Sequence, residues 1–238
     1  MIKTRISAIM QPTYLPWSGY FGLIGSVSNF VFLDDVQISI PSWQNRNRIM
    51  GQSGPYYLTL PANLKFASSK IIRDIPLINE ESVKQKHIEA IRHSYRKAPF
   101  YEEVFFILQE VYSRDHSYLS NFTIDLIRTF SAVLGYDTIF HRSSEITAQG
   151  SRSEKLVGIL RYLNSDCYYS PSGSREYIEQ DAIFSRENIP VYFQNFVPEP
   201  YAQLAPGFTP YLSAIDSFFC IGFEETKLII SRNQSFVN

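Results

Sequence analysis

The sequence predicts an α/β protein: a parallel-based, Rossmann-like sheet with an antiparallel hairpin addition and a helical block inserted between its halves. Three observations favour this class. Residues 6–10 and 30–33 are short apolar runs typical of buried strands, and apolar residues at helical spacing lie between them. Residues 45–50 and 56–60 flank a glycine-containing turn, which predicts a hairpin. Residues 79–135 show helical periodicity throughout.

The first βαβ unit indicates where a ligand would bind. The strand at residues 6–10 ends at Gln11, and the second strand ends at Asp34 and Asp35. In an open parallel sheet, ligands bind outside the carboxyl ends of the strands. We therefore expect Gln11 and the two aspartates to lie at the functional edge of the sheet.

The first strand of the hairpin is unusually polar. In an extended strand, Asn45 and Asn47 would face one way while Arg46 and Arg48 face the other. Two guanidinium groups spaced about 6–7 Å apart along a strand suit an anionic ligand such as a diphosphate. A solvated edge strand that carries basic side chains is the alternative interpretation.

The helical block predicts three helices, which begin near residues 83, 100 and 119, and Gly135 follows the third as a stop signal. His87 lies on the apolar stripe of the first helix. It could act as a general base if it reaches a cleft, or be a satisfied core residue, which is the commoner case. No His, Cys, Asp or Glu cluster has metal-ligand spacing, so no metal site is predicted.

The second half of the chain continues the sheet with predicted strands at 138–140, 166–169 and 190–193. A Ser/Gly-rich loop follows the strand at 166–169, and the helix predicted to begin near residue 150 could also present free backbone N–H groups to an anion. Prolines between 198 and 210 predict an ordered loop, then a short helix from about 212 and a tail or terminal helix from 224. No repeat or linker divides residues 1–238, so a single domain is expected.

The composition excludes several classes of protein. The 238 residues are 45% hydrophobic and carry a net charge of −1, which argues for a globular chain and against general nucleic-acid binding. Cys167 and Cys220 are too few and too far apart to indicate a disulfide scaffold. We see neither a signal peptide nor a transmembrane run and expect a cytoplasmic protein. The sequence does not indicate the oligomeric state.

Seven sequence blocks, spread from residue 9 to residue 219, together resemble the WbqC-like family of bacterial polysaccharide-cluster proteins. The blocks are I-M-Q-P-T-Y-L-P-W-S-G-Y-F (9–21), F-V-F-L-D-D-V-Q (30–37), W-Q-N-R-N-R-I (43–49), Y-R-K-A-P-F-Y (95–101), R-S-S-E-I (142–146), Y-S-P-S-G-S-R-E-Y-I (169–178) and Y-A-Q-L-x-x-G-F-x-P-Y-L-S-A-I-D-S-F-F (201–219). The resemblance implies O-antigen (lipopolysaccharide) or capsule biosynthesis, with glycyl-like aminoacyl or acyl transfer to the amino group of a nucleotide-linked amino-sugar.

The first block also resembles, more distantly, the nucleotidylyl-transferase and pantothenate-synthetase group. In that group a helix that begins H-x-G-H holds the phosphates of ATP, whereas W-S-G-Y stands here at 17–20 and only Gly19 matches. This resemblance implies an alternative function as an ATP-dependent amide ligase or nucleotidyl transferase that uses ATP and Mg²⁺. Otherwise no cofactor is expected. Trp17 and Tyr20 could instead stack against a sugar or base, or simply pack.

For acyl transfer, a base must take the proton of the amine, and Asp34, Asp35 and His87 are the candidates. Arg46, Arg48 and Arg175 would hold the diphosphate or an activated acyl donor. Gln11 and Asn45 or Asn47 would orient sugar hydroxyls or stabilise an oxyanion. The expected partners are a nucleotide-linked sugar and an acyl donor, for which aminoacyl-tRNA, a carrier thioester and an amino acid with ATP stay open. A non-catalytic sugar-nucleotide binding protein is a further alternative. The candidate substrate-binding residues are Gln11, Tyr14, Trp17, Gly19, Tyr20, Gln37, Asn45, Arg46, Asn47, Arg48, Ser170, Ser172, Gly173 and Arg175.

Overall fold

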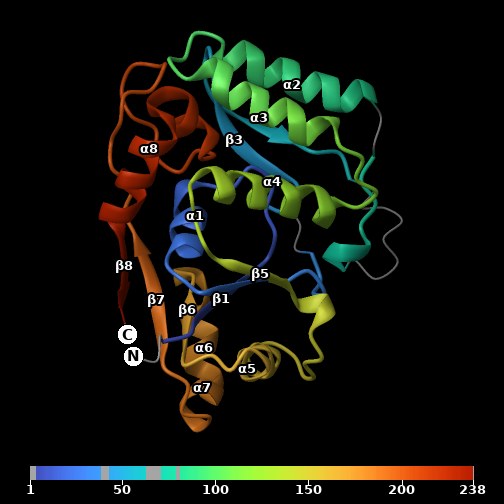
Figure 1. Ribbon diagram of the computed structural model, residues 1–238, viewed down its shortest axis with the longest axis vertical. Coiled ribbons are helices and arrows are strands. Elements are labelled where there is room, and N and C mark those ends of the chain that lie inside the picture. Colours follow the sequence, from blue (N-terminus) through green and yellow to red (C-terminus); the bar gives the residue numbers. More distant parts are fainter. Residues whose placement is uncertain (1–3, 39–42, 63–70, 79–80, 238) are drawn as a thin grey trace.

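The main feature of the fold is a six-stranded sheet. In a computed structural model that describes residues 4–38, 43–62, 71–78 and 81–237 (backbone only for 81–83), the strands lie in the order β5-β2-β1-β6-β7-β8 (Figure 1). All neighbours are parallel except β7 and β8, which are antiparallel. The strands are β1 (Ile6–Met10), β2 (Asn29–Phe32), β5 (Ile139–Arg142), β6 (Cys167–Ser170), β7 (Val191–Phe196) and β8 (Gln234–Val237).

The strand order places a topological switch point at β1. From β1 the chain proceeds outward through β2 to β5, and then returns to the other side of β1 for β6 and β7. Two crossover connections therefore leave the sheet in opposite directions between β1 and β6, and the crevice outside their carboxyl ends is the place where such sheets bind ligands. The predicted Rossmann-like class is confirmed.

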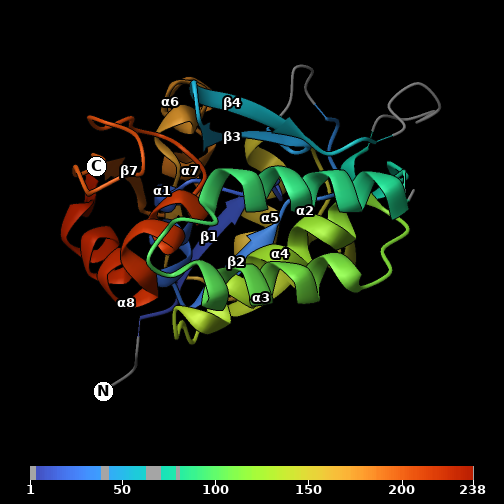
Figure 2. The ribbon, with the colours of Figure 1, turned by 90° about the horizontal axis from the view of Figure 1, so that it is seen from above.

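The predicted hairpin and helical block are both inserted between β2 and β5. The hairpin pairs β3 (Arg46–Gly51) with β4 (Gly54–Thr59) as a separate two-stranded sheet, and it lies alongside α2 (Figure 2). The helices of the block are α2 (Glu81–Tyr95), α3 (Tyr101–Ser113) and α4 (Leu119–Val133), preceded by the short 3-10 helix η1 (Ile72–Asp74).

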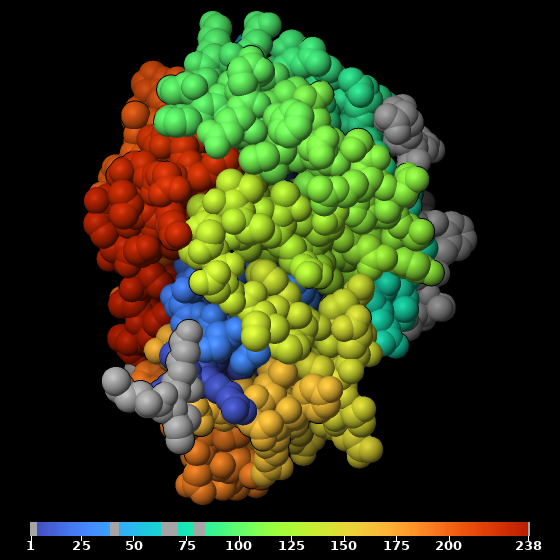
Figure 3. Space-filling model, viewed as in Figure 1, coloured from blue at the N-terminus to red at the C-terminus, as the bar shows by residue number. Residues whose placement is uncertain are grey.

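Alternate residues of the central strands supply two separate cores. Ala8 and Phe30 face the core formed with α1 (Ser18–Gly25), α4 and α8 (Ile215–Asn233). Ile9 and Val31 face the other core, formed with α5 (Ser153–Tyr162), α6 (Arg175–Asp181) and α7 (Ile183–Arg186). This alternation is the expected consequence of the two-residue period of a strand. Side chains of the helical block and of α8 cover most of the face seen in Figure 3.

The last part of the chain differs from the predicted short helix from about 212 and tail or terminal helix from 224. The segment from 215 to 233 is helical throughout except for a kink at Gly222, whose φ of +78° suits glycine and whose missing side chain makes room for the ring of Phe100. The chain then adds β8 to the sheet, which the sequence analysis did not predict because four residues after a helix show no clear strand period. The described helices include none that is long and apolar enough to span a bilayer.

Candidate functional site

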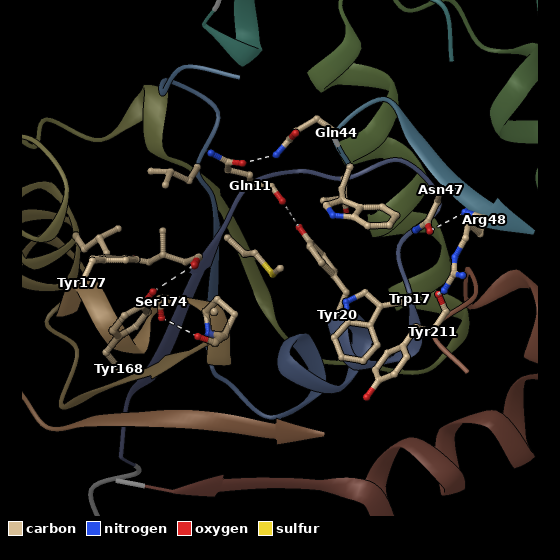
Figure 4. A pocket seen from close by; sticks show the side chains of 18 residues that line it. Gln11, Trp17, Tyr20, Gln44, Asn47, Arg48, Tyr168, Ser174, Tyr177 and Tyr211 are labelled. Carbon is tan, nitrogen blue, oxygen red and sulfur yellow. Dashed lines mark hydrogen bonds between the residues drawn. The ribbon is translucent and has the colours of Figure 1, made fainter. Parts of the chain in front are cut away.

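A cavity of about 700 Å³ opens at the switch point, where the carboxyl ends of β1, β2 and β6 meet (Figure 4). Gln11 follows β1, Leu33 follows β2, and Gly173 and Ser174 follow β6 within the short 3-10 helix η3 (Ser172–Ser174). These residues are far apart in the sequence, and the parallel topology alone brings them to one edge.

The hairpin and a late loop form the opposite wall of the cavity. Gln44, Asn47 and Arg48 come from the start of the hairpin, and Tyr211 comes from the loop that precedes α8. Gln44 donates a hydrogen bond to the side chain of Gln11, so this bond joins the residues before the hairpin to the end of β1 (Figure 4). The remaining wall residues are Ile9, Met10, Thr13, Trp17, Tyr20, Trp43, Leu156, Tyr168, Pro171 and Tyr177.

Aromatic rings dominate one side of the cavity. The ring centroid of Trp17 lies 5.6 Å from that of Tyr211, and the indole lies directly above Gly19, where an added Cβ would be 2.2 Å from it. Tyr20 is almost fully buried, and its hydroxyl donates to the Gln11 carbonyl at 3.0 Å. The wall therefore combines aromatic rings with side-chain amides, which are the groups that recognise a sugar or a base.

The other side of the cavity is built around η3. The Ser174 hydroxyl is hydrogen-bonded to that of Ser170 and donates to the Pro171 carbonyl at 2.7 Å, which fixes the turn. Burial raises the pKa of Tyr177, and a hydrogen bond with Ser174 opposes this shift only in part. The phenol of Tyr177 is therefore neutral at physiological pH and can donate or accept a hydrogen bond.

Two polar atoms of wall residues have no hydrogen-bond partner. Among the described residues, four buried side-chain polar atoms lack one, and two of these are Thr13 Oγ1 and Arg48 Nε. A buried polar atom left unpaired costs about 1–3 kcal/mol. Such atoms are uncommon in folded proteins and call for an explanation at the site where they occur.

The carboxylate of Asp34 is fully used in hydrogen bonds and an ion pair with other residues of the protein. Its side chain is fully buried and accepts from Arg142 Nε at 2.7 Å, from the Ser144 N–H at 3.0 Å and from the Ser144 hydroxyl at 3.0 Å. Arg142 also donates to Asn121 at 3.0 Å, so this ion pair joins the sheet to α4. Asp34 does not line the cavity. The catalytic role predicted for it stays a prediction, and its contacts are those of a structural carboxylate.

Asp35 also lies outside the lining of the cavity, but it is only partly buried, and the catalytic role predicted for it stays a prediction. Its carboxylate accepts from Lys155 Nζ at 2.6 Å and from the Ser143 hydroxyl at 2.5 Å. Burial alone would raise the pKa of Asp35, but the hydrogen bonds from Lys155 and Ser143 and the charge of Lys155 outweigh it and hold the pKa below its usual value. Asp35 is therefore ionised at neutral pH.

His87 belongs to a buried cluster behind the cavity. Its Nδ1 is hydrogen-bonded to the Tyr14 hydroxyl at 2.8 Å, and that hydroxyl also bonds to the hydroxyl of Tyr112. Burial lowers the pKa of His87 to about 4, against a smaller opposing effect of a hydrogen bond to the backbone of Thr59. The imidazole is neutral, but neither His87 nor Tyr14 lines the cavity, so their predicted roles in catalysis and binding stay predictions.

The predicted substrate-binding residues separate into two groups. The wall of the cavity contains Gln11, Trp17, Tyr20, Asn47, Arg48 and Gly173. It does not contain Tyr14, Gly19, Gln37, Asn45, Arg46, Ser170, Ser172 or Arg175.

Most members of the second group have contacts elsewhere. Arg46 lies over the ring of Tyr57, 4.6 Å from its centroid, and Arg175 lies 4.1 Å from the ring centroid of Phe193 while pairing with Glu179. Asn45 donates to the Leu60 carbonyl at 3.3 Å, and Gln37 is exposed and forms an isolated bridge with Ile71.

Sequence reasoning did not assign four prominent wall residues: Trp43, Gln44, Tyr177 and Tyr211. Each lies in one of the sequence blocks that carry the family resemblance, and this position was the signal available. The described residues contain no group of three or more His, Cys, Asp or Glu that could hold a metal ion.

Comparisons with known proteins agree with the resemblance. A family model described as the WbqC-like protein family matches residues 11–228. The chain is also 30% identical over 219 residues to the uncharacterized protein Rv1507c of Mycobacterium tuberculosis, a match that covers 91% of this chain and 94% of that protein. No solved structure matches. The chain belongs to the WbqC-like protein family.

Proposed function

We propose that this protein is a transferase of bacterial surface-polysaccharide biosynthesis that joins an acyl or aminoacyl group to the amino group of a nucleotide-linked amino sugar. The observation that carries the proposal is the cavity at the switch point, whose wall contains the rings of Trp17 and Tyr211 and the amides of Gln11, Gln44 and Asn47. Its volume of about 700 Å³ lies within the range for small-molecule sites, about 300–1,000 Å³. The unpartnered Thr13 Oγ1 and Arg48 Nε on its wall also support a polar ligand.

The transfer would form one C–N bond and break one bond. The neutral amine attacks the acyl carbon, the bond to the leaving group breaks, and the proton of the amine passes to a base or to that leaving group. Asp35 is ionised but lies outside the lining of the cavity, and the bonds that hold its pKa low make it a weak base, so the leaving group is the better acceptor of the proton. Gln11 and Asn47 would orient hydroxyl groups or the developing oxyanion.

A product assay tests the proposal. The full-length chain is incubated with nucleotide-linked amino sugars and with acyl-coenzyme A, aminoacyl-tRNA, or amino acid plus Mg-ATP, and mass spectrometry detects the N-acylated sugar nucleotide. We expect product with one donor, and we expect Tyr211→Ala to raise the KM for the sugar about five- to tenfold, because one ring contact is lost. Phe106→Ala is the control, because Phe106 is exposed on α3 and outside the wall.

Two other results would replace the proposal. Product that forms only with Mg-ATP, with release of pyrophosphate, identifies a ligase, or a nucleotidyl transferase if the nucleotide is itself transferred. The indole above Gly19 lies where that group of enzymes would need an open helix start for phosphates, which weighs against this alternative. Tight binding of the sugar nucleotide without product from any donor identifies a binding protein.

A further inference from the structure

A second hollow of about 440 Å³ adjoins the cavity. The two spaces share Gln11, Leu33, Leu156 and Tyr177 in their walls, so they lie side by side at the carboxyl end of β1. The other residues that line the hollow are Val36, Arg152 and Lys155. A ligand that fills the cavity can therefore extend past Gln11 and Tyr177 into the hollow.

The hollow is basic. Arg152 and Lys155 are its charged lining residues, and the lining includes no carboxylate. Lys155 pairs with Asp35 at 2.6 Å, just outside the lining. Within the described part of the chain, the guanidinium of Arg152 has neither a hydrogen bond nor an ion pair. The lining therefore carries positive charge, and the nearby carboxylates of Asp35 and of Glu154, in the first turn of α5, lie outside it.

The three arginines that the sequence assigns to a diphosphate are less well placed for it. The Arg46 guanidinium stacks on Tyr57, and that of Arg175 lies on Phe193 and pairs with Glu179. Arg48 lines the cavity but donates to the carbonyls of Pro210 and Tyr211, at 3.4 Å each.

Arg152 and Lys155 are also favoured by the backbone. Arg152 is the residue that caps the ten-residue helix α5, and Lys155 lies in its first turn. Both cations therefore stand at the positive end of the helix dipole, which adds to their attraction for an anion. An arginine can bind two phosphate oxygens with its planar fork, while a lysine supplies a compact charge.

We infer that the hollow of Arg152 and Lys155 binds the diphosphate of the sugar nucleotide whose sugar occupies the cavity. The inference rests on the proposed function for the identity of the ligand. Asp35 competes with the diphosphate for Lys155 in this arrangement, since both bind the same ammonium group.

Titration calorimetry of the full-length chain with inorganic pyrophosphate tests this site without any turnover. We expect binding that weakens as salt rises, because the contacts are ionic. Arg152→Gln should weaken it about tenfold or more, as expected when a hydrogen bond to a charged group is lost. Asp35→Asn should tighten it severalfold, because the competing charge next to Lys155 is gone. Arg175→Gln is the matched control and should bind as the wild type does.

Arg152→Gly is a second variant that keeps the result interpretable. Arg152 has a φ of +47°, in the region that favours glycine, so this change removes the charge while relieving the backbone. We expect a melting temperature at or above that of the wild type together with weakened pyrophosphate binding. Lower binding caused by damage to the fold would instead come with a lower melting temperature.

The results separate the inference from the proposed function. No pyrophosphate binding, or binding lost in Arg175→Gln but kept in Arg152→Gln, overturns the inference. Pyrophosphate binding that depends on Arg152, in a protein that acylates no sugar with any donor, supports the hollow and overturns the proposed function. Acyl transfer with an unchanged KM for the sugar nucleotide in Arg152→Gln supports the function and overturns the hollow.

Discussion

Asp34 and Asp35 follow the same strand, yet Asp34 belongs to the interior of the protein whereas Asp35 is partly exposed beside Lys155. Asp34 is fully buried, and both of its oxygens are hydrogen-bonded. Asp35 has one cationic partner, Lys155, which also lines an open hollow. One carboxylate therefore has no bonding capacity left for a ligand, while the other lies beside a space that a ligand can enter.

The same contrast separates two larger regions. Behind the cavity, Asp216 is fully buried and accepts from Tyr95 at 3.0 Å, from Tyr201 at 2.7 Å and from Gln203 at 2.8 Å. On the cavity wall, Thr13 Oγ1 and Arg48 Nε have no partner among the described residues. Polar groups whose hydrogen bonds are all satisfied within the protein hold the loops in place, whereas groups without a partner are available to a ligand.

The largest effect that tests this comparison is on stability. Asp34→Ala leaves Arg142 without its buried partner; loss of one member of a fully buried pair costs about 3–5 kcal/mol, and because Arg142 is 28% exposed we expect a loss at or below the lower end of that range. Urea denaturation measures the change in the free energy of unfolding. Asp74→Ala is the control, because both members of the Arg73–Asp74 pair are exposed, and we expect it to cost less than about 1 kcal/mol. Equal decreases in the free energy of unfolding of the two variants would show that the Asp34–Arg142 pair does not stabilise the interior.

A second test uses the acid stability of the buried cluster around His87. Because burial holds the pKa of His87 at about 4 against 6.5 for the free side chain, the unfolded chain binds a proton first as the pH falls. The contribution of the neutral His87 to the free energy of unfolding is therefore complete above pH 6.5 and decreases as the pH falls to about 4. The total decrease is up to ~3 kcal/mol.

Denaturation at a series of pH values measures this loss, and His87→Gln should remove that part of the slope. His93→Gln alters an exposed histidine of the same helix and is the control. A slope that survives in His87→Gln would show that other groups cause the acid loss.

Asp216 tests the interior network that joins Tyr95 to Tyr201 and Gln203 of the loop before α8. Asp216→Asn replaces an acceptor oxygen with a donor that must face the donors of its neighbours, and we expect a loss of about 1–3 kcal/mol. Burial raises the pKa of Asp216, against the opposing hydrogen bonds from Tyr201, Tyr95 and Gln203.

As the pH rises from the unfolded pKa of Asp216 to its raised folded pKa, the folded state keeps the proton that the unfolded state releases. The wild type therefore loses stability over this range, and Asp216→Asn, which has no proton to release, does not. The difference in the free energy of unfolding between the two should narrow with rising pH. Asp137→Asn, at an exposed position, should show no such trend, and a difference that widens with pH would contradict the raised pKa of Asp216.

The sequence contains enough to predict most of the fold, though not β8, and only part of the site. Apolar period and turn residues indicate β1, β2, the hairpin and the helices of the block, because these patterns are local. Gln11 and Gly173 could be expected at one edge, because parallel strands present their carboxyl ends together. The choice of Arg142 as the partner of Asp34 depends on a pairing across 108 residues, which no local pattern contains. Tyr211 likewise reaches the wall through the tertiary path of its loop.

The smallest expected effect on stability is that of Asp35, and its contribution to stability changes with pH in the opposite direction to that of Asp216. Lys155 and Ser143 hold the pKa of Asp35 below its usual value, against the raising effect of burial. Its contribution is therefore present above the unfolded pKa of 3.8 and is lost as the pH falls through the lowered folded value. Because the pair is partly solvated, Asp35→Asn should cost less than about 1 kcal/mol.

The same denaturation series measures both aspartates. The difference between wild type and Asp35→Asn should be greatest near neutral pH and close on acidification, whereas the difference for Asp216→Asn should grow on acidification. Slopes of the same sign would mean that Lys155 does not hold Asp35 ionised, and Asp35 would then belong with the interior carboxylates. Opposite slopes, together with tighter pyrophosphate binding in Asp35→Asn, would show that its pairing with Lys155 is weak enough for an anion to replace it.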